Sequence, residues 1–468
     1  MGLTNGGRAR TPHERVVSCE VMKGIKVRLL NGKLRRAIAR VVGKPGTLRF
    51  RLARDTVGVM AIRALSMGLS FAVSVVLARL LGVREFGLYS LAMSVLGLLV
   101  VPATFGFPRL LVREIAAYRV KGEWGLIRGL LRFAQRTSLL ASLGIALLGG
   151  FVLWALSDRF SGEAVRVLAL AFLALPFWAL LNLHGAALRG FEQILAGQWV
   201  STVMRPLGFL ILVGAIWLFA GGMADASLAL VLHILAAGIA LTFAFCLLRS
   251  QLRRSVSTYA ANQDTVVWIR SALSLAFLAL LNLIPQHAGI LMLGWIRSPE
   301  EVGLYKVAYQ SAAMISVLYM VVATVIAPTL SQLHASGDLQ RLKRVLHAAT
   351  LCSLAILLPF LLVFTIGRRW FLITVFGNSY LSSTGPLSIL ALAFSIEATF
   401  GPLWEALVMG GYQNGLVKIS LLSSILFVCV NAFLANLAGS SGTAIAFVLF
   451  YAFRTMLIVR FAKQQKLL

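Results

Sequence analysis

The stretch 76–114, VLARLLGVREFGLYSLAMSVLGLLVVPATFGFPRLLVRE, decides the fold of this chain. One long apolar segment ends at Leu81 and a second begins at Leu88, with only GVREFG between them. Each segment is close to the ~20 residues that a helix needs to cross a bilayer. Arg109 and Arg113 follow the second segment. The stretch therefore predicts a helical membrane hairpin with a tight outer turn, shaped by residues 87–89, and a basic inner end.

A weaker copy of this hairpin lies at 293–330, LGWIRSPEEVGLYKVAYQSAAMISVLYMVVATVIAPTL. Five residues recur at a constant offset of 216 positions, and the matched pairs are Glu85/Glu301, Gly87/Gly303, Leu88/Leu304, Tyr89/Tyr305 and Ala92/Ala308. Six predicted spans separate the copies. Because six is even, both halves enter the membrane in the same direction. We expect two parallel bundles around a central cavity that opens alternately to the two sides.

The composition excludes a soluble protein. The 468 residues are 59% hydrophobic and only 13% charged, too few charges to cover the surface of a soluble chain of this length. The formal charge of +28 could suggest nucleic-acid binding. However, the basic residues lie mostly between apolar segments and near the N-terminus, which is typical of loops on one side of a membrane. We therefore expect membrane lipids, and no nucleic acid, as partners.

The hydropathy pattern predicts an all-α polytopic membrane protein with twelve spans. The predicted spans are 57–81, 88–106, 137–157, 165–188, 199–221, 226–248, 269–296, 304–330, 346–367, 383–407, 415–437 and 441–461. The corresponding organisation is a basic cytoplasmic tail (1–56), an N-terminal six-helix bundle (57–248), a cytoplasmic linker (249–268) and a C-terminal six-helix bundle (269–468).

The distribution of basic residues predicts the orientation. Most of the 44 Lys and Arg residues lie in the segments that this topology places inside, so both termini are expected in the cytoplasm. One inner connection contains EWGLIRGLLRFAQR at 123–136. Its mixture of Trp, Leu and Arg favours a helix lying in the inner membrane interface, with a simple extension of the third span as the alternative.

Charges within spans need a reason, because each costs roughly 2.5–3.5 kcal/mol on insertion scales. Arg63 and Arg205 each lie ~9 Å inside the predicted inner edge of a span. They either extend their guanidinium groups to the interface or bind phosphate in a cavity open to the cytoplasm. Arginine suits the second role because its planar group makes bidentate contacts and keeps its charge. Lys306 lies near the outer start of its span.

Polar side chains form a stripe on two spans in the same register. Arg63, Ser66 and Ser70 fall on one face of the first span. Asn282 and Gln286 fall on one face of the seventh span, and the offset of 216 aligns Ser66 with Asn282 and Ser70 with Gln286. Two aligned stripes predict that both helices face a common water-filled cavity, although serine also serves simple helix packing.

Two carboxylates, Glu397 and Glu405, lie in the tenth predicted span. Either one could take up a proton or sodium and couple transport to an ion gradient, or form a salt bridge or cap near Gly401 and Pro402. The intramembrane histidines His184, His233 and His287 are either proton relays or packed, hydrogen-bonded side chains. Among them, His287 is the ion-coupling candidate on the polar-stripe helix.

The sequence indicates no metal, cofactor or catalytic residue. The four cysteines form no CxxC pair, and no nearby histidine has metal-ligand spacing. The chain has no GxxxxGK[ST] motif for ATP. The longest predicted outer connection, at 368–382, is short. We therefore expect a transporter rather than an enzyme.

The hairpin LARLLGVREFGLYSLAMSV with its exit FGFPRLLVREIAAY resembles the start of Wzx-type oligosaccharide flippases. These polysaccharide biosynthesis membrane proteins belong to the multidrug/oligosaccharidyl-lipid/polysaccharide (MOP) exporter superfamily, which includes the MATE transporters. The resemblance covers residues 57–119 most closely. It implies a MATE-like fold in the cell membrane and a polyprenyl-pyrophosphate-linked oligosaccharide as substrate, with glycan polymerases and glycosyltransferases as expected partners. In that function Arg63 and Arg205 would engage the pyrophosphate, and Ser66, Ser70, Asn282 and Gln286 would bind sugar hydroxyls.

Two other functions stay open from the sequence. A drug or cation antiporter of the same superfamily would favour an excess of cavity carboxylates. A polyprenyl-linked glycan polymerase or ligase would need a large outer loop that carries catalytic side chains.

Overall fold

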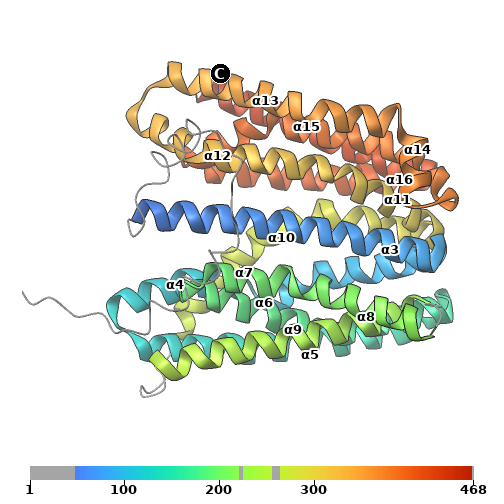
Figure 1. Ribbon diagram of the computed structural model, residues 1–468, viewed down its shortest axis with the longest axis horizontal. Helices are drawn as coiled ribbons and strands as arrows, with labels where there is room; N and C mark the ends of the chain where they lie inside the picture. Colours follow the sequence, from blue (N-terminus) through green and yellow to red (C-terminus); the bar gives the residue numbers. More distant parts are fainter. Residues whose placement is uncertain (1–47, 221–224, 256–263, 466–468) are drawn as a thin grey trace, which may run out of the picture. The chain divides into compact units, whose positions relative to one another are not determined.

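The computed structural model describes residues 48–220, 225–255 and 264–465 (Figure 1). It divides into two compact units, residues 1–58 and 59–468. Most of the predicted basic tail and part of the predicted linker at 249–268 lie outside the described residues.

Every regular element among the described residues is a helix. The helices are α3 (Leu48–Thr104), α4 (Phe107–Lys121), α5 (Trp124–Ala155), η2 (Ser157–Arg159), α6 (Gly162–Gly190), α7 (Ile194–Thr202), α8 (Met204–Ala220), α9 (Ala226–Ser255), α10 (Thr265–Ile296), α11 (Pro299–Ala312), α12 (Met314–Ser336), α13 (Leu339–Thr365), α14 (Arg368–Val375), η3 (Asn378–Ser383), α15 (Thr384–Met409) and α16 (Gln413–Gln464). The predicted all-α fold is confirmed.

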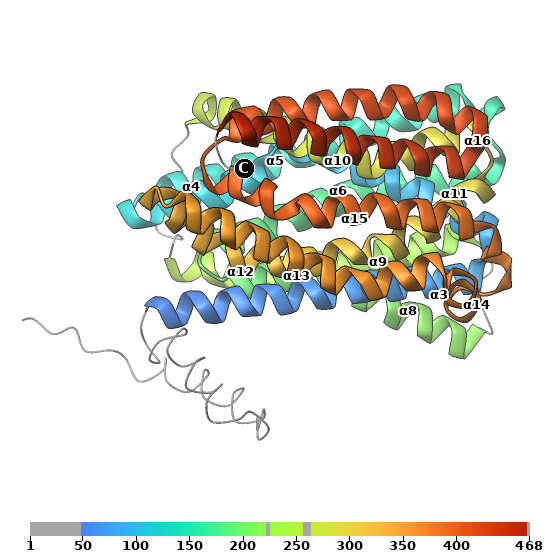
Figure 2. The same ribbon diagram turned by 90° about the horizontal axis from the view of Figure 1, so that it is seen from above.

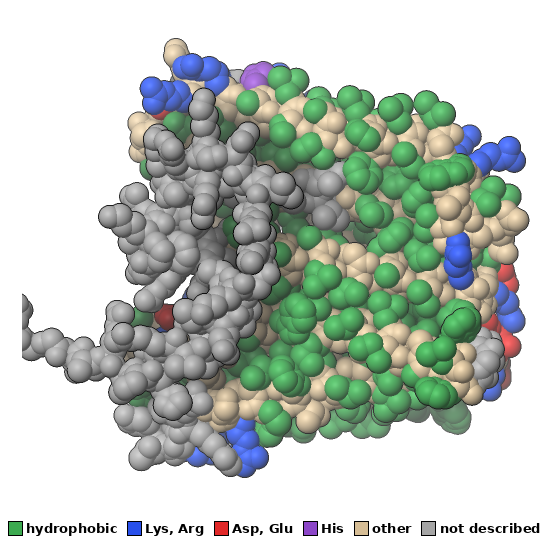
Figure 3. Space-filling view, in the orientation of Figure 1, with side chains coloured by type: hydrophobic (Ala, Val, Ile, Leu, Met, Phe, Trp, Pro, Cys, Tyr) green, Lys and Arg blue, Asp and Glu red, His purple; other side chains and the backbone are tan. Residues whose placement is uncertain are grey.

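Eight helices in the described ranges are long and apolar enough to cross a membrane, and the bent helix α10 makes nine if it is one span. Two of the eight contain non-helical residues, α3 at Gly82 and α16 at Ala438 and Gly439. The count of twelve spans stays a prediction. Figure 3 shows hydrophobic side chains over most of the visible face, with Lys and Arg near the ends of the helices. This is the surface that a bilayer requires.

The helices pack in two groups that α10 joins. In the first group, α6 packs against α5 and α9, and α9 packs against α8 (Figures 1 and 2). In the second group, α15 packs against α12, α13 and α16. Helix α10 contacts α5 of the first group, α4, which packs on α5 and α6, and α16 of the second group. Its Trp268 is fully buried in a core formed with Phe107, Ile127 and Leu131. The start of α10, at the border between the predicted linker and the predicted C-terminal bundle, therefore packs against N-terminal helices.

The predicted six-residue outer turn is wrong in detail. Helix α3 turns back at Gly82 alone, which has φ 75° and ψ 179°, and helical structure resumes at Val83 (Figure 1). A side chain would strain this positive φ, so glycine suits the site. Residues 87–89 are helical and do not shape the turn, contrary to the prediction.

The predicted interfacial helix at 123–136 is also wrong, and the alternative holds. These residues form the start of α5, a continuous 32-residue helix. The amphipathic helix that directly precedes α5 is α4, which buries Phe107, Leu110, Leu111 and Ile115. Glycines with positive φ bound it on both sides, at Gly106 and Gly122.

The two hairpins cross each other at Gly87 and Gly303. A Cβ atom at position 87 would overlap the carbonyl oxygen of Pro299, and one at position 303 would overlap that of Val83. Pro299 is the residue that the offset of 216 matches with Val83, so the two contacts are reciprocal. Such reciprocity is the mark of a twofold relation between the halves. Small residues at a membrane helix crossing allow this close backbone approach.

Polar contacts surround the crossing, again in matched positions. Glu85 Oε2 accepts a hydrogen bond from the backbone N–H of Ala226 (2.9 Å), and Glu301 Oε2 accepts one from Ser440 (2.8 Å). Each carboxylate thus meets unpaired N–H groups at the start of a helical segment. Arg84 adds ion pairs to Glu163 (2.9 Å) and Glu300 (3.4 Å). Together these contacts close this end of the bundle.

We expect Gly87→Ala and Gly303→Ala to destabilise the protein by about 1–3 kcal/mol, because the added methyl group meets backbone and the helices must move apart. Thermal unfolding of the purified protein in detergent measures this. Gly144→Ala on α5, where a methyl group meets nothing within 4 Å, is the control. Equal melting temperatures for Gly87→Ala and Gly144→Ala would contradict the tight crossing.

Candidate functional site

The first pocket, called the Arg205 pocket, has a volume of about 130 Å³. Its polar lining includes Ser70, Tyr89, Arg205, His233, Lys306 and Gln310. Arg205 comes from the N-terminal group of helices and Lys306 from α11, in the second half of the chain. No carboxylate is among the described residues that line it. The pocket therefore combines two cations without an acidic partner.

Arg205 owes its position to a break between helices. Helix α7 ends at Thr202, and α8 begins at Met204, so Arg205 lies in the first turn of α8. Its guanidinium carbon lies 4.4 Å from the centre of the Trp178 ring. Its Nε atom is buried and has no hydrogen-bond partner among the described residues. An unpaired buried donor is costly, so a ligand that accepts its hydrogen bond would bind favourably here.

His233 lines this pocket as a packed side chain. Its Nδ1 atom lies 2.7 Å from the Tyr89 hydroxyl, and its ring stacks on Phe209 with 4.5 Å between the ring centres. These contacts hold the aromatic wall beside Arg205. They support the packing interpretation of His233 over a proton relay.

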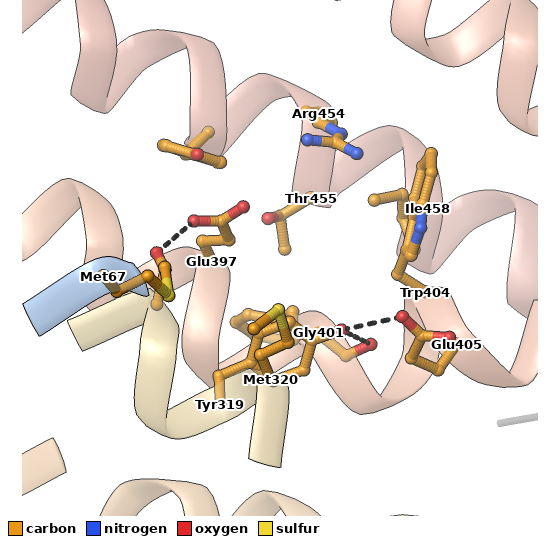
Figure 4. Close-up of a pocket in the computed structure, with 13 residues that line it drawn as sticks. Met67, Tyr319, Met320, Glu397, Gly401, Trp404, Glu405, Arg454, Thr455 and Ile458 are labelled. Atoms are coloured by element: carbon orange, nitrogen blue, oxygen red, sulfur yellow. Dashed lines mark hydrogen bonds between the residues drawn. The ribbon is translucent and has the colours of Figure 1, made fainter. Parts of the chain in front are cut away.

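The second pocket, called the Trp404 pocket, has a volume of about 290 Å³ (Figure 4). Helices α12, α15 and α16 form most of it, and Met67 of α3 completes it. It brings together both predicted carboxylates. Ser316 donates a hydrogen bond to Glu397 (2.7 Å). The Tyr319 hydroxyl lies 3.0 Å from the Gly401 carbonyl oxygen and 3.4 Å from Glu405.

The same pocket contains Arg454, which was not among the predicted site residues. Its guanidinium carbon lies 4.2 Å from the Trp404 ring centre, and its Nε atom is buried without a hydrogen-bond partner among the described residues. The position falls within the predicted span 441–461, so the rule that a charge in a span needs a reason could have identified it.

A third pocket of about 170 Å³, called the Gln286 pocket, shares Glu397, Tyr451 and Arg454 with the Trp404 pocket. Of the two polar stripes, Ser70 lines the Arg205 pocket and Gln286 lines this one. Ser70 and Gln286 thus line different pockets, and a cavity common to both stripes stays a prediction. The side chain of Asn282 lies outside the described part of the structure.

The remaining predicted site residues line none of the three pockets, although Arg63 contacts Met320, which lines the Trp404 pocket. Arg63 is exposed, and its Nη1 atom lies 3.7 Å from the sulfur of Met320. Ser66 donates a hydrogen bond to the carbonyl oxygen of Thr202 (3.0 Å), which ties α3 to α7. His287 packs so closely against Gly97 that a Cβ there would overlap its ring, and it lines none of the three pockets above.

Solved structures define the class. The chain matches the lipid II flippase MurJ in its inward closed conformation with a TM-score of 0.66 and 13% identity, over 86% of this chain and 87% of that one. It matches an inward-facing MATE family multidrug resistance transporter of the MOP superfamily with a TM-score of 0.66 and 12% identity, over 87% and 94% of the two chains. The protein is therefore a multi-pass α-helical membrane protein with the MOP exporter fold.

The family follows from the sequence comparison. The model of the polysaccharide biosynthesis protein family matches residues 52–334, more than half of the chain, and the chain belongs to that family. The expected resemblance is confirmed. A curated relative, the probable low-salt glycan biosynthesis flippase Agl15 of Haloferax volcanii, is 22% identical over 419 residues, which cover 87% of this chain and 82% of the relative.

Water should reach the polar lining of the Arg205 pocket. In a variant whose four cysteines are replaced, we expect Ser70→Cys to react with a water-soluble maleimide, because Ser70 is exposed and lines the pocket. Ser138→Cys on α5 should not react, because Ser138 is fully buried. Labelling followed by mass spectrometry measures both. Equal protection of the two positions would contradict a hydrated pocket.

Proposed function

We propose that this protein is a flippase that moves a polyprenyl-pyrophosphate-linked oligosaccharide across the cell membrane for surface polysaccharide synthesis. The family and the flippase name of the relative in Haloferax volcanii support this function. The substrate has an anionic, hydrophilic head and a lipid tail that stays in the bilayer. Transport requires a polar path for the head only, and no covalent chemistry.

The Arg205 pocket is the observation that carries the proposal. Two cations in a pocket with no carboxylate among its described lining residues attract an anion strongly. Arg205 has in-plane donors that fit phosphate oxygens, and Lys306 adds a second charge. Ser70 and Gln310 line the same pocket and can donate further hydrogen bonds. These groups suit a pyrophosphate better than a neutral or cationic ligand.

The origin of the two cations suggests how the head is released. Arg205 belongs to α8 and Lys306 to α11, in different halves of the chain. In alternating access, one bundle rocks against the other around the substrate site. Rocking that separates the two cations weakens their joint hold on the phosphates. Substrate release is then a direct result of the opening movement.

The orientation follows the positive-inside rule in this proposal. The end of the bundle that carries α4 is rich in Arg and Lys, so we assign it to the cytoplasm together with the C-terminus. The end closed around Gly87 and Gly303 then faces outside. The conformation described here would accept substrate from the cytoplasmic leaflet.

Glu397 is the preferred ion-coupling residue in this proposal. It lines both the Trp404 and the Gln286 pockets and accepts a hydrogen bond from Ser316. Glu405 is the second candidate. His287 has less support, because it packs against Gly97.

A cation antiporter is the second candidate function, favoured by the MATE-like fold and by the two carboxylates of the Trp404 pocket. Arg454 in the same pocket and the cations of the Arg205 pocket oppose it, because they repel a cationic ligand. A glycan polymerase or ligase is disfavoured by the short connection at 368–382, which forms α14 and η3.

The first test uses Arg205→Ala and Lys306→Ala in a cell that depends on this gene for a surface glycan. We expect surface glycan synthesis to fall roughly tenfold or more, because losing one charge-assisted contact changes affinity by at least that factor. Unaltered lipid-linked oligosaccharide should accumulate on the cytoplasmic face. Arg159→Ala, an exposed cation outside the pockets, is the control at matched protein levels.

Normal glycan synthesis in both pocket variants would contradict phosphate binding in the Arg205 pocket. Accumulation of unpolymerised product outside the cell would instead indicate a polymerase. Resistance to cationic drugs that depends on the gene, with normal glycan, would indicate the antiporter.

The second test concerns coupling. In proteoliposomes, Glu397→Gln should keep substrate binding but lose the stimulation of transport by an imposed proton or sodium gradient, because the amide does not titrate. Comparison of rates with and without the gradient measures this effect. Full stimulation in the variant would remove Glu397 as the coupling residue, and Glu405→Gln would then be compared in the same assay.

A further inference from the structure

The Trp404 pocket has a composition that differs from the Arg205 pocket. Its lining includes the aromatic residues Tyr319, Phe400 and Trp404. It also contains two carboxylates, Glu397 and Glu405, and one guanidinium group, that of Arg454 (Figure 4). Phe400 is 39% exposed although it lines the pocket, so part of its ring is available for contact.

The charges of this pocket argue against phosphate or an organic cation as its main ligand and favour a neutral molecule. A site for phosphate would not contain two carboxylates, and a site for an organic cation would not contain Arg454. Coupling to a proton or sodium alone does not require the four aromatic side chains of this lining, Tyr319, Phe400, Trp404 and Tyr451. A neutral molecule with both apolar and hydrogen-bonding surfaces satisfies all of these groups at once.

A sugar ring is such a molecule. Its C–H groups lie well against the negative face of an aromatic ring such as Phe400. Its hydroxyl groups donate to carboxylates and accept from guanidinium groups, which match Glu405 and Arg454. Stacking on Trp404 occupies the face of Arg454, while the unpaired Nε–H and the other in-plane donors remain at its edge.

The two pockets lie on the same part of α3. Met67 lines the Trp404 pocket, and Ser70 lines the Arg205 pocket. These residues are one helical turn apart, a rise of about 4.5 Å. In the second half of the chain, Gln310 of α11 lines the Arg205 pocket and Ser316 of α12 lines the Trp404 pocket. One ligand with adjacent phosphate and sugar groups can therefore occupy both pockets.

We propose that the Trp404 pocket is a sugar subsite, in which Phe400, Glu405 and Arg454 bind a ring of the glycan while the pyrophosphate occupies the Arg205 pocket. This inference rests on the proposed flippase function and refines it. The protein then recognises two parts of one substrate, and the subsite favours a carrier that bears its glycan over the bare carrier.

Native mass spectrometry of the purified full-length protein in detergent tests the subsite. The two probes are lipid-linked oligosaccharide extracted from cells that lack the gene, and bare polyprenyl pyrophosphate prepared from it by removing the glycan. The wild type should prefer the glycan-bearing lipid roughly tenfold, a difference that one or two hydrogen bonds with stacking supply. Phe400→Ala and Glu405→Gln should remove most of this preference without weakening the bare carrier.

Two further variants separate the inference from the function that it refines. Arg205→Ala should weaken the binding of both lipids, and Phe151→Ala, which removes a 62% exposed ring on α5, should change neither. If Arg205→Ala weakens both lipids while the Phe400 and Glu405 variants keep the preference, the sugar subsite is wrong and the flippase proposal stands. Binding of neither lipid by the wild type overturns both.

Discussion

The close backbone contact between Gly87 and Gly303 is the constraint on which the rest of the structure depends. It brings the two hairpins together where no side chain fits. Tyr89, two residues after Gly87, and Lys306, three residues after Gly303, both line the Arg205 pocket. Glu85 and Glu301 link the same hairpins to α9 and α16. The crossing thus fixes both the relation of the two halves and the position of their first binding pocket.

Each group of helices holds one arginine against a tryptophan, Arg205 on Trp178 and Arg454 on Trp404. An arginine within a membrane protein needs compensation for its lost hydration. An aromatic ring supplies it at the face of the guanidinium group, where hydrogen bonds do not form, and the donors in the plane stay free for a ligand. A carboxylate partner would use these donors instead. The tryptophan therefore stabilises the charge and keeps its binding capacity.

The sequence predicted the helical class, the repeat and the family, because apolar length and a constant offset can be read directly from the order of residues. It failed where the outcome depends on packing between distant segments. The predicted six-residue turn is reduced to Gly82, and Gly87 lies instead where the two hairpins cross. Arg454 and Lys306 line pockets because particular helices pack beside them. The periodicity of a single helix does not show which helices are its neighbours. For the same reason, the sequence did not show that Ser70 and Gln286 line different pockets.

The ion pair between Arg84 and Glu300 is possible only because the two halves of the chain differ in sequence. The offset of 216 makes these two positions equivalent. Both lie beside the crossing of the two hairpins, and Arg84 Nε is 3.4 Å from Glu300 Oε1. In a dimer of two identical half-length chains, both positions would hold the same residue, and two like charges would repel. Attraction here requires that the copies differ. In the joined chain, a substitution changes this contact in one half alone, whereas in a symmetric pair of subunits it would change both equivalent positions.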